Sequence, residues 1–269
     1  MQKSDGWAGI LCIRGENSQM ISDIYVMSTW ECDNNVLLQQ ASRFLIKGLQ
    51  KLGSGGSIEY PCLYFFLEDR IEGENICCND PVQLGCPQFM LKMMKIRAKK
   101  SLLEAGSSLG LYMANGMNQF DSWNNAIPFD LDTAAKYFGE FYIYEEAMKS
   151  IEQCNSQPNK EFLLKLLQIF TLTKVKESFT TLAGNMEVDM IKMINEYLLK
   201  TYEEIKFDAV LCLDGLLMED EIVRSPLGSK SGNMYEQFLA RIMTQSDNFG
   251  KAPYWKEIVS VRNGCKLDL

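Results

Sequence analysis

The sequence predicts an all-α fold, a helical bundle, on three observations. Apolar residues recur at three- and four-residue steps in several long segments, which is the spacing of one helical face. Pro87 and Pro158 stand where two of these segments begin, and proline is tolerated in the first turn of a helix. No segment alternates convincingly at the two-residue period of a half-buried strand. Helices packed on helices account for this pattern.

The first predicted helix covers residues 34–52. Its apolar face contains Val36, Leu37, Leu38, Ala41, Phe44, Leu45, Gly48, Leu49 and Leu52. Asp33 or Asn34 can accept hydrogen bonds from the free N–H groups of the first turn. Residues 53–56, Gly-Ser-Gly-Gly, tolerate positive φ and end the helix. Glu31 therefore lies just before a helix N-terminus, where it is either a catalytic base facing a pocket or a surface carboxylate favoured by the helix dipole.

Residues 53–86 have a loop-like composition, and the apolar run at residues 63–67 is expected to pack onto the core. This stretch marks the natural boundary between two helical layers. The helix that starts at Pro87 carries a buried stripe that includes Met90, Leu91, Met93, Met94, Ile96, Leu102, Leu103 and Ala105. Methionines can also form an adaptable binding groove, but at this spacing core packing is the better interpretation.

Four further helical segments follow. Asp130 or Asp132 is predicted to cap an aromatic-rich helix, and Pro158 opens the next one. Residues 187–216 form one long helix or two in line, and a last helix lies near 233–243.

Composition excludes several classes of function. At 269 residues and 46% apolar content, the chain can form one large or two modest domains with a real core. The net charge of −8 argues against a nucleic-acid surface, and the basic run Lys95, Arg97, Lys99 and Lys100 is interpreted as the solvated side of a helix. No run of 18 apolar residues and no signal peptide is found, which predicts a soluble intracellular protein without a membrane span.

The absence of histidine removes Ser-His, Cys-His and His-ligated metal chemistry, so a base must be a carboxylate, Lys, Tyr or Cys. The nine cysteines contain no CxxC pair. The adjacent Cys77 and Cys78 are poorly spaced as zinc ligands, so reduced thiols and no metal site are expected. The acidic pairs at residues 203–204 and 219–221 are interpreted as solvated helix faces.

Three blocks, in one order along the chain, carry a resemblance to a known family. The first is Trp30-Glu31-Cys32-Asp33-Asn34-Asn35-Val36-Leu37-Leu38-Gln39-Gln40. The second is Ser122-Trp123-Asn124-Asn125 with Phe129-Asp130-Leu131, in which a turn that contains Trp precedes a helix. The third runs from Phe207 to Leu216 and continues through Val223-Arg224-Ser225-Pro226-Leu227-Gly228 and Gly232-Asn233-Met234-Tyr235-Glu236. Together these blocks resemble acyl-CoA oxidases, and the last block resembles their closing helical region.

The resemblance covers nearly the whole chain, but only the C-terminal portion of such an oxidase. It implies two regions: a partial acyl-CoA oxidase/dehydrogenase-like helical region with the catalytic turn at 1–86, and a C-terminal-like helical domain at 87–269. The N-terminal domains, which hold most of the flavin and the acyl-CoA in this family, have no equivalent here. We therefore expect the isolated chain to be inactive.

The resemblance also implies a reaction and a site. Acyl-CoA oxidases convert acyl-CoA to trans-2-enoyl-CoA in fatty-acid β-oxidation, with FAD as cofactor and hydrogen peroxide as second product. Glu31 takes the place of the catalytic base, and Asp33 and Asn35 fall where the family lines the flavin. Cys32 replaces the family's glycine after the catalytic Glu, which adds a Cβ and disfavours positive φ.

Two functional hypotheses follow. In the first, the chain is a C-terminal portion of a peroxisomal, FAD-dependent acyl-CoA oxidase that acts on acyl-CoA as a homodimer or with another oxidase subunit. In the second, it is a non-catalytic helical module, derived from such an oxidase, that serves dimerisation or interaction. The closing residues 266–269, Lys-Leu-Asp-Leu, are not a Ser-Lys-Leu-type import signal, so a cytoplasmic location stays open.

Overall fold

The computed structural model describes residues 23, 25–26, 30, 32–57, 60–67, 75–78, 80–215, 225–244, 250–251 and 254–262. The chain divides into two compact units, residues 29–209 and residues 1–28 with 210–269. Within the described part, the backbone forms helices and no strand, which confirms the predicted all-α fold. The division into regions 1–86 and 87–269 stays a prediction.

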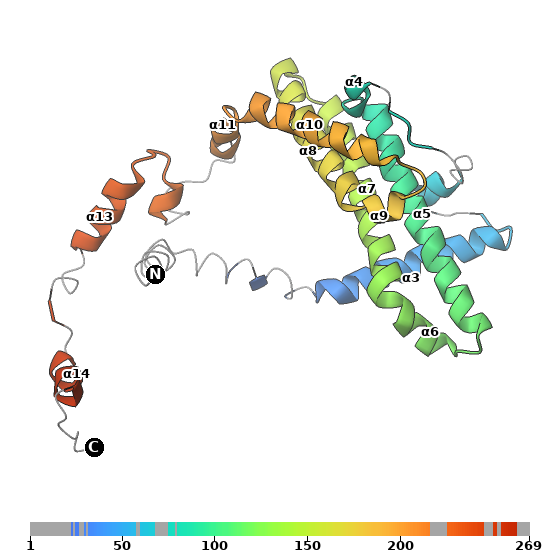
Figure 1. The fold of residues 1–269 in the computed structure, drawn as a ribbon, viewed down its shortest axis with the longest axis horizontal. Coiled ribbons are helices and arrows are strands. Elements are labelled where there is room, and N and C mark those ends of the chain that lie inside the picture. Colours follow the sequence, from blue (N-terminus) through green and yellow to red (C-terminus); the bar gives the residue numbers. More distant parts are fainter. Residues whose placement is uncertain are drawn as a thin grey trace. The chain divides into compact units, whose positions relative to one another are not determined.

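The larger unit is a helical bundle centred on two long helices (Figure 1). Helices α5 and α7 pack side by side, α3 lies against α7, α8 contacts both α5 and α7, and α10 packs on α8. Its elements are α3 (Asn34–Gly53), η1 (Pro61–Phe66), α4 (Pro81–Leu84), α5 (Pro87–Ala114), α6 (Gln119–Ala126), the π-helical η2 (Ile127–Leu131), α7 (Asp132–Glu152), α8 (Gln157–Glu177), α9 (Phe179–Leu182) and α10 (Val188–Ile205).

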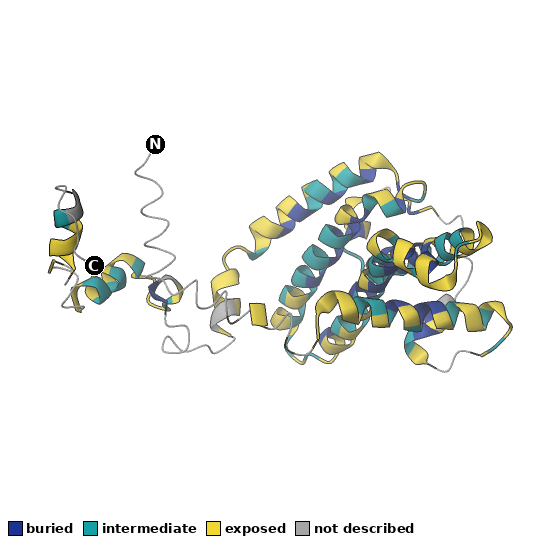
Figure 2. Cartoon of the chain, turned by 90° about the horizontal axis from the view of Figure 1, so that it is seen from below, coloured by how far each residue is buried: buried dark blue, intermediate teal, exposed yellow. Residues whose placement is uncertain are grey.

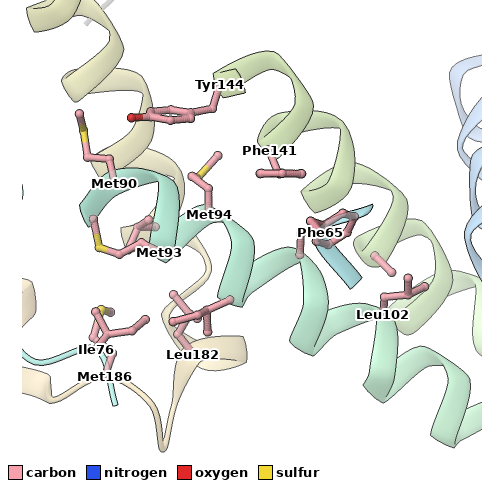
Figure 3. Close-up of a cluster of buried hydrophobic side chains, with 14 of the residues drawn as sticks. Phe65, Ile76, Met90, Met93, Met94, Leu102, Phe141, Tyr144, Leu182 and Met186 are labelled. Carbon is pink, nitrogen blue, oxygen red and sulfur yellow. The ribbon is translucent and has the colours of Figure 1, made fainter. Parts of the chain in front are cut away.

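The core of this unit contains the methionine stripe of α5. Met90, Met93 and Met94 are fully buried, and Met90 and Met94 lie toward Tyr144 and Phe141 of α7 (Figure 3). Buried residues follow the facing sides of the helices, whereas exposed residues cover their outer sides (Figure 2). Each such side chain stabilises the fold by about 1.5–3 kcal/mol through removal from water. Core packing of the methionines is therefore confirmed.

The apolar run after the first helix packs onto the core in part, since Tyr64 and Leu67 are exposed. Leu63 and Phe65, both in the short helix η1, are buried. The Phe65 ring lies with its centroid 4.9 Å from that of Phe141 and 5.8 Å from that of Phe138. Aromatic pairs at such distances stabilise a core beyond their buried area. Helix η1 thus packs the chain that follows α3 against the centre of the bundle.

The predicted capping of the aromatic-rich helix by Asp130 or Asp132 is wrong. The chain is already helical before these residues, because Asn118 caps α6 through its side chain and the π-helical turn η2 leads directly into α7. The predicted turn that contains Trp123 is therefore a helix. Pro128 lies in the first turn of η2. A π-helical turn keeps the chain helical around this proline, so α7 has no free N-terminus to cap.

The interpretation of the basic run as a solvated face is also wrong. Arg97 is fully buried, and Lys99 is 9% exposed. The Arg97 guanidinium donates hydrogen bonds to the carboxylate of Glu140 in α7 and to the carbonyl oxygen of Lys174, at 2.9 Å. Its centre lies 4.3 Å from the Tyr137 ring centroid. Burial lowers the pKa of Arg97, and the Glu140 carboxylate opposes this shift. The partners lie on other helices, which the local sequence does not reveal.

The described part of the smaller unit contains short helices. They are α11 (Ala209–Asp214), η3 (Pro226–Gly228), α13 (Met234–Thr244) and α14 (Trp255–Arg262). The predicted last helix near 233–243 is confirmed as α13, and α14 was not predicted. The predicted segment 187–216 is two helices, since α10 ends at Ile205 and α11 begins at Ala209. Among the described residues, no helix combines the length and the apolar character that a membrane crossing requires.

Candidate functional site

The candidate site is the turn that precedes α3. Trp30 is 66% exposed, and Cys32, Asp33, Asn34 and Asn35 are exposed as well. Glu31, the predicted base, lies outside the described residues. Trp30 and the start of α3 therefore present a group of solvent-accessible side chains.

Cys32 has the backbone conformation that glycine adopts freely. Its φ is 105°, and among the described residues no other non-glycine residue has a positive φ. A residue with a Cβ costs on the order of 1–3 kcal/mol in such a conformation. The chain therefore keeps a glycine-type turn after Glu31 although the sequence supplies cysteine there.

Asp33 is the N-cap of α3. Its φ of −62° and ψ of 135° are extended, and its Oδ1 accepts a hydrogen bond of 2.8 Å from the backbone N–H of Asn35. This confirms the predicted cap and gives the Asp33 carboxylate a structural role at the turn. The Asn35 side chain is exposed in the first turn of the helix. Assignment of Asp33 and Asn35 to a flavin stays a prediction.

Side chains from Ser42 onward fix α3 against the bundle. The Ser42 hydroxyl lies 2.8 Å from the carbonyl oxygen of Leu131 in η2, and Leu45 and Ile46 are buried. A Cβ at Gly48 would lie 2.7 Å from Cδ1 of Leu63, so a larger residue here would displace the Leu63 side chain of η1. The helix is thus fixed along its buried side, while its first turn stays exposed.

Two buried polar atoms lie in the α6–η2–α7 segment beside α3. Trp123 Nε1 and Asp132 Oδ1 have no hydrogen-bond partner within the described structure. Burial raises the pKa of Asp132, because the ionised carboxylate loses its hydration. The Arg43 guanidinium of α3 lies over the Trp123 ring, 5.5 Å from its centroid.

A second feature of α3, its row of cations, was not predicted from the sequence. Arg43, Lys47 and Lys51 are spaced four residues apart and line one cavity with a volume of about 450 Å³. The four-residue spacing of these cations in a predicted helix could have indicated that they share one side of it. It did not distinguish a cavity wall from an ordinary solvated face, because the other wall comes from residues after the helix.

Comparisons with known proteins agree with the resemblance. The family model described as acyl-CoA oxidase matches residues 86–262. The chain is 26% identical over 222 residues to acyl-coenzyme A oxidase acox-1.1 of Caenorhabditis elegans, covering 80% of this chain and 32% of that protein. It is 23% identical to the rat protein named peroxisomal acyl-coenzyme A oxidase 2, covering 86% of this chain and 35% of the relative. The chain thus spans about a third of the length of these relatives.

Solved structures share the fold. An acyl-CoA oxidase from Yarrowia lipolytica superposes with a TM-score of 0.85 at 18% identity, covering 99% of this chain and 38% of the other. Acyl-CoA oxidase-2 of Caenorhabditis elegans, solved with FAD, ascaroside-CoA and ATP, gives a TM-score of 0.78 at 20% identity and covers 89% of this chain and 35% of the other. The match of the family model to well over half of the residues shows that this chain belongs to the acyl-CoA oxidase family.

Proposed function

We propose that this chain is the C-terminal portion of an FAD-dependent acyl-CoA oxidase and that it supplies the catalytic base, Glu31. The overall reaction converts acyl-CoA and molecular oxygen to trans-2-enoyl-CoA and hydrogen peroxide, as a step of fatty-acid β-oxidation. Family membership supports this proposal, and so does the FAD-containing and acyl-CoA-containing structure of a relative from Caenorhabditis elegans.

The conformation of Cys32 is the observation that carries the proposal. A helix N-cap such as Asp33 does not by itself require a positive φ in the residue before it. A strained cysteine is retained only where the surrounding structure imposes that conformation, and strained residues concentrate at functional sites. The positive φ therefore supports a turn shaped to hold the preceding carboxylate beside a substrate.

The proposed chemistry assigns one proton transfer to Glu31. Its carboxylate removes a proton from the carbon next to the thioester, and a site from which water is excluded would raise its basicity. The backbone N–H of Glu31 polarises the thioester carbonyl, where negative charge develops. FAD, when bound, supplies the acceptor for the hydride that leaves the neighbouring carbon.

The residues next to Glu31 fit one edge of such a cofactor. The exposed Asn35 amide offers both a donor and an acceptor, and the start of α3 carries backbone N–H groups that favour polar or anionic groups. These side chains cannot enclose a flavin by themselves. The rest of its binding site would come from a flavin-binding portion, as in the relatives about three times as long.

Partners and location follow the same proposal. Acyl-CoA is the substrate, and the chain associates with a second copy or with another acyl-CoA oxidase subunit. A peroxisomal location is supported by the rat relative, which is named a peroxisomal oxidase.

The test is to isolate the protein from its source with an affinity tag, so that any covalent or associated flavin-binding portion is retained. We expect visible flavin absorbance and acyl-CoA-dependent release of peroxide. Glu31→Gln should keep the flavin and lower peroxide release by about 10²–10⁴-fold, the usual contribution of a general base. Glu196→Gln, on the exposed side of α10, is the matched control and should leave both unchanged. Undiminished peroxide release in Glu31→Gln would refute the assignment.

The second candidate is a non-catalytic interaction module. Exposed apolar side chains favour such a module. Five of them, in two helices, are more than 60% exposed: Tyr235, Leu239 and Met243 of α13, and Val210 and Leu211 of α11. A colourless protein that forms a dimer and releases no peroxide with acyl-CoA would select this candidate over the oxidase.

A further inference from the structure

The connection between α5 and α6 contains the dipeptide Asn115-Gly116. It lies at one end of the bundle, where the 28-residue α5 ends at Ala114 and α6 begins at Gln119 (Figure 1). Both residues of the dipeptide are exposed to solvent. Within the described part of the chain, no hydrogen bond to the Asn115 side chain is found. The amide of Asn115 is therefore accessible to water and is not held by a neighbour there.

The glycine determines the shape of this turn. Gly116 has a φ of 85°, a conformation that glycine adopts without a steric cost. A Cβ at this position would meet no atom within 4 Å, so the space around the dipeptide is open. Because glycine has no side chain, nothing on Gly116 shields its backbone nitrogen from the side chain of Asn115.

Three backbone hydrogen bonds close the end of α5. The N–H groups of Asn115, Gly116 and Met117 donate to the carbonyl oxygens of Leu111, Met113 and Tyr112, at 3.0, 3.0 and 3.2 Å respectively. Only the bond from Gly116 has to open before its nitrogen is free to react. The last turn of a helix frays, and such local opening costs far less free energy than unfolding of the whole unit.

We infer that Asn115 is a site of spontaneous deamidation. The backbone nitrogen of Gly116 forms a bond to Cγ of Asn115, and the side-chain nitrogen leaves as ammonia with the proton from the N–H group. The resulting succinimide ring takes up one water molecule and opens to aspartate or to isoaspartate. Water enters and ammonia leaves, so the step needs no oxidant or reductant. The inference does not depend on the proposed oxidase reaction.

The products change the end of α5 in two ways. A carboxylate at residue 115 places a negative charge at a helix C-terminus, where the helix dipole disfavours it. Isoaspartate also lengthens the backbone by one carbon atom between residues 115 and 116, which displaces the N–H groups that close the helix. Residues 115–118 form the whole connection to α6. We therefore expect the first turn of α6 to open more often in the isoaspartate form.

Incubation of the purified full chain at neutral and at mildly alkaline pH tests the inference. Peptide mapping by mass spectrometry follows the mass difference between an amide and a carboxylic acid, and fragmentation assigns it to a residue. Two exposed asparagines that precede larger residues serve as internal controls, Asn118 before Gln119 and Asn159 before Lys160. Asn115 should lose its amide at least about tenfold faster than either, which corresponds to a barrier lower by about 1.4 kcal/mol.

The rate of loss should rise with pH, because the attacking nitrogen has to give up its proton. The pair Asn263-Gly264 lies outside the described residues, and its peptide is separated from that of Asn115 by cleavage after basic residues. Conversion at residue 263 is therefore read independently.

Asn115→Gln is the matched variant, because glutamine keeps an amide but would have to close a larger ring. We expect this variant to keep its amide over the time in which the wild type is converted. Hydrogen exchange in the first turn of α6 should be faster in the incubated wild type than in the fresh protein, and unchanged by incubation in the variant. Thermal unfolding of the fresh proteins checks that both have the same fold.

The inference is overturned if Asn115 keeps its amide as long as Asn118 and Asn159 do, or if the rate of its loss is independent of pH. Equal hydrogen exchange in α6 before and after conversion would contradict the expected effect on that helix.

Discussion

Helices α10 and α13 have the same kind of apolar pattern but different surroundings. In α10, Met190, Ile194 and Leu198 recur every four residues and are all at most 5% exposed. In α13, Tyr235, Leu239 and Met243 recur at the same spacing and are all more than 60% exposed. The comparison shows that apolar periodicity predicts a helix and its apolar face, but not whether another element covers that face.

The reason lies in the neighbours each helix has within its own unit. Helix α10 packs on α8 and α4, whereas in the described part of its unit α13 packs mainly on the three-residue η3. Isolated helices shorter than about 12–15 residues are marginal in water, and α13 has 11 residues. Tertiary contacts therefore stabilise α10, and α13 lacks comparable contacts within the described part of its unit.

The largest effect is expected for the buried ion pair of the bundle. Arg97→Met leaves the Glu140 carboxylate without its main partner in a site that is 8% exposed. The free energy of unfolding should fall by about 3–5 kcal/mol, measured by chemical denaturation. Lys192→Met, which removes an exposed pair with Asp189, should cost no more than about 1 kcal/mol. Equal losses in the two variants would show that Arg97 is solvated.

A matched pair of leucines tests the comparison itself. Leu198→Ala in α10 should lower the free energy of unfolding by about 2–5 kcal/mol, because it creates a cavity in the core. Leu239→Ala in α13 should change it by less than about 0.5 kcal/mol, since that side chain is 61% exposed. A large loss for Leu239→Ala would mean that α13 is covered in solution, and the contrast between the helices would disappear.

A smaller effect is expected where α4 meets its neighbours. A Cβ at Gly85 would lie 2.1 Å from the hydroxyl oxygen of Tyr197 in α10 and 3.1 Å from Nε2 of Gln168 in α8. Gly85→Ala should therefore cost about 1–3 kcal/mol of unfolding free energy. Gly139→Ala is the control, because no atom lies within 4 Å of its added Cβ, and thermal denaturation distinguishes the two. A Gly85→Ala variant as stable as the control would contradict this packing.

The smallest effect is a pH dependence at Asp132. Burial raises its pKa, so its ionised form is disfavoured in the folded chain and stability falls as pH rises through that pKa. Asparagine carries no charge, so Asp132→Asn should become more stable than the wild type as pH rises to neutral, and the difference should vanish in acid. Denaturation midpoints at several pH values measure this. A constant difference at all pH values would exclude titration of Asp132 as its cause.

Features determined by local chemistry could be predicted from the sequence. The Asp33 cap, the proline at the start of α5 and the buried methionine stripe depend on neighbouring residues or on helical spacing. Features determined by distant partners could not be predicted. Burial of Arg97 depends on Glu140, 43 residues further along the chain, and the cavity beside α3 needs Tyr60 as its other wall.

The candidate site shows the same limit. The sequence identified the exposed turn with Asp33 and Asn35, and it predicted that Cys32 would oppose a positive φ. The structure gives Cys32 a φ of 105°, because the conformation of a turn depends on the chain on both sides of it. The roles of Glu31, Asp33 and Asn35 stay predictions.

Exchange of the substrate proton with solvent tests the central claim, that Glu31 is the base, most directly. Acyl-CoA deuterated on the carbon next to the thioester is incubated with the protein isolated from its source, and loss of deuterium is followed by mass spectrometry. We predict loss of deuterium with the wild type and a rate lower by about 10²–10⁴-fold with Glu31→Gln. Equal rates with the two proteins would contradict the account.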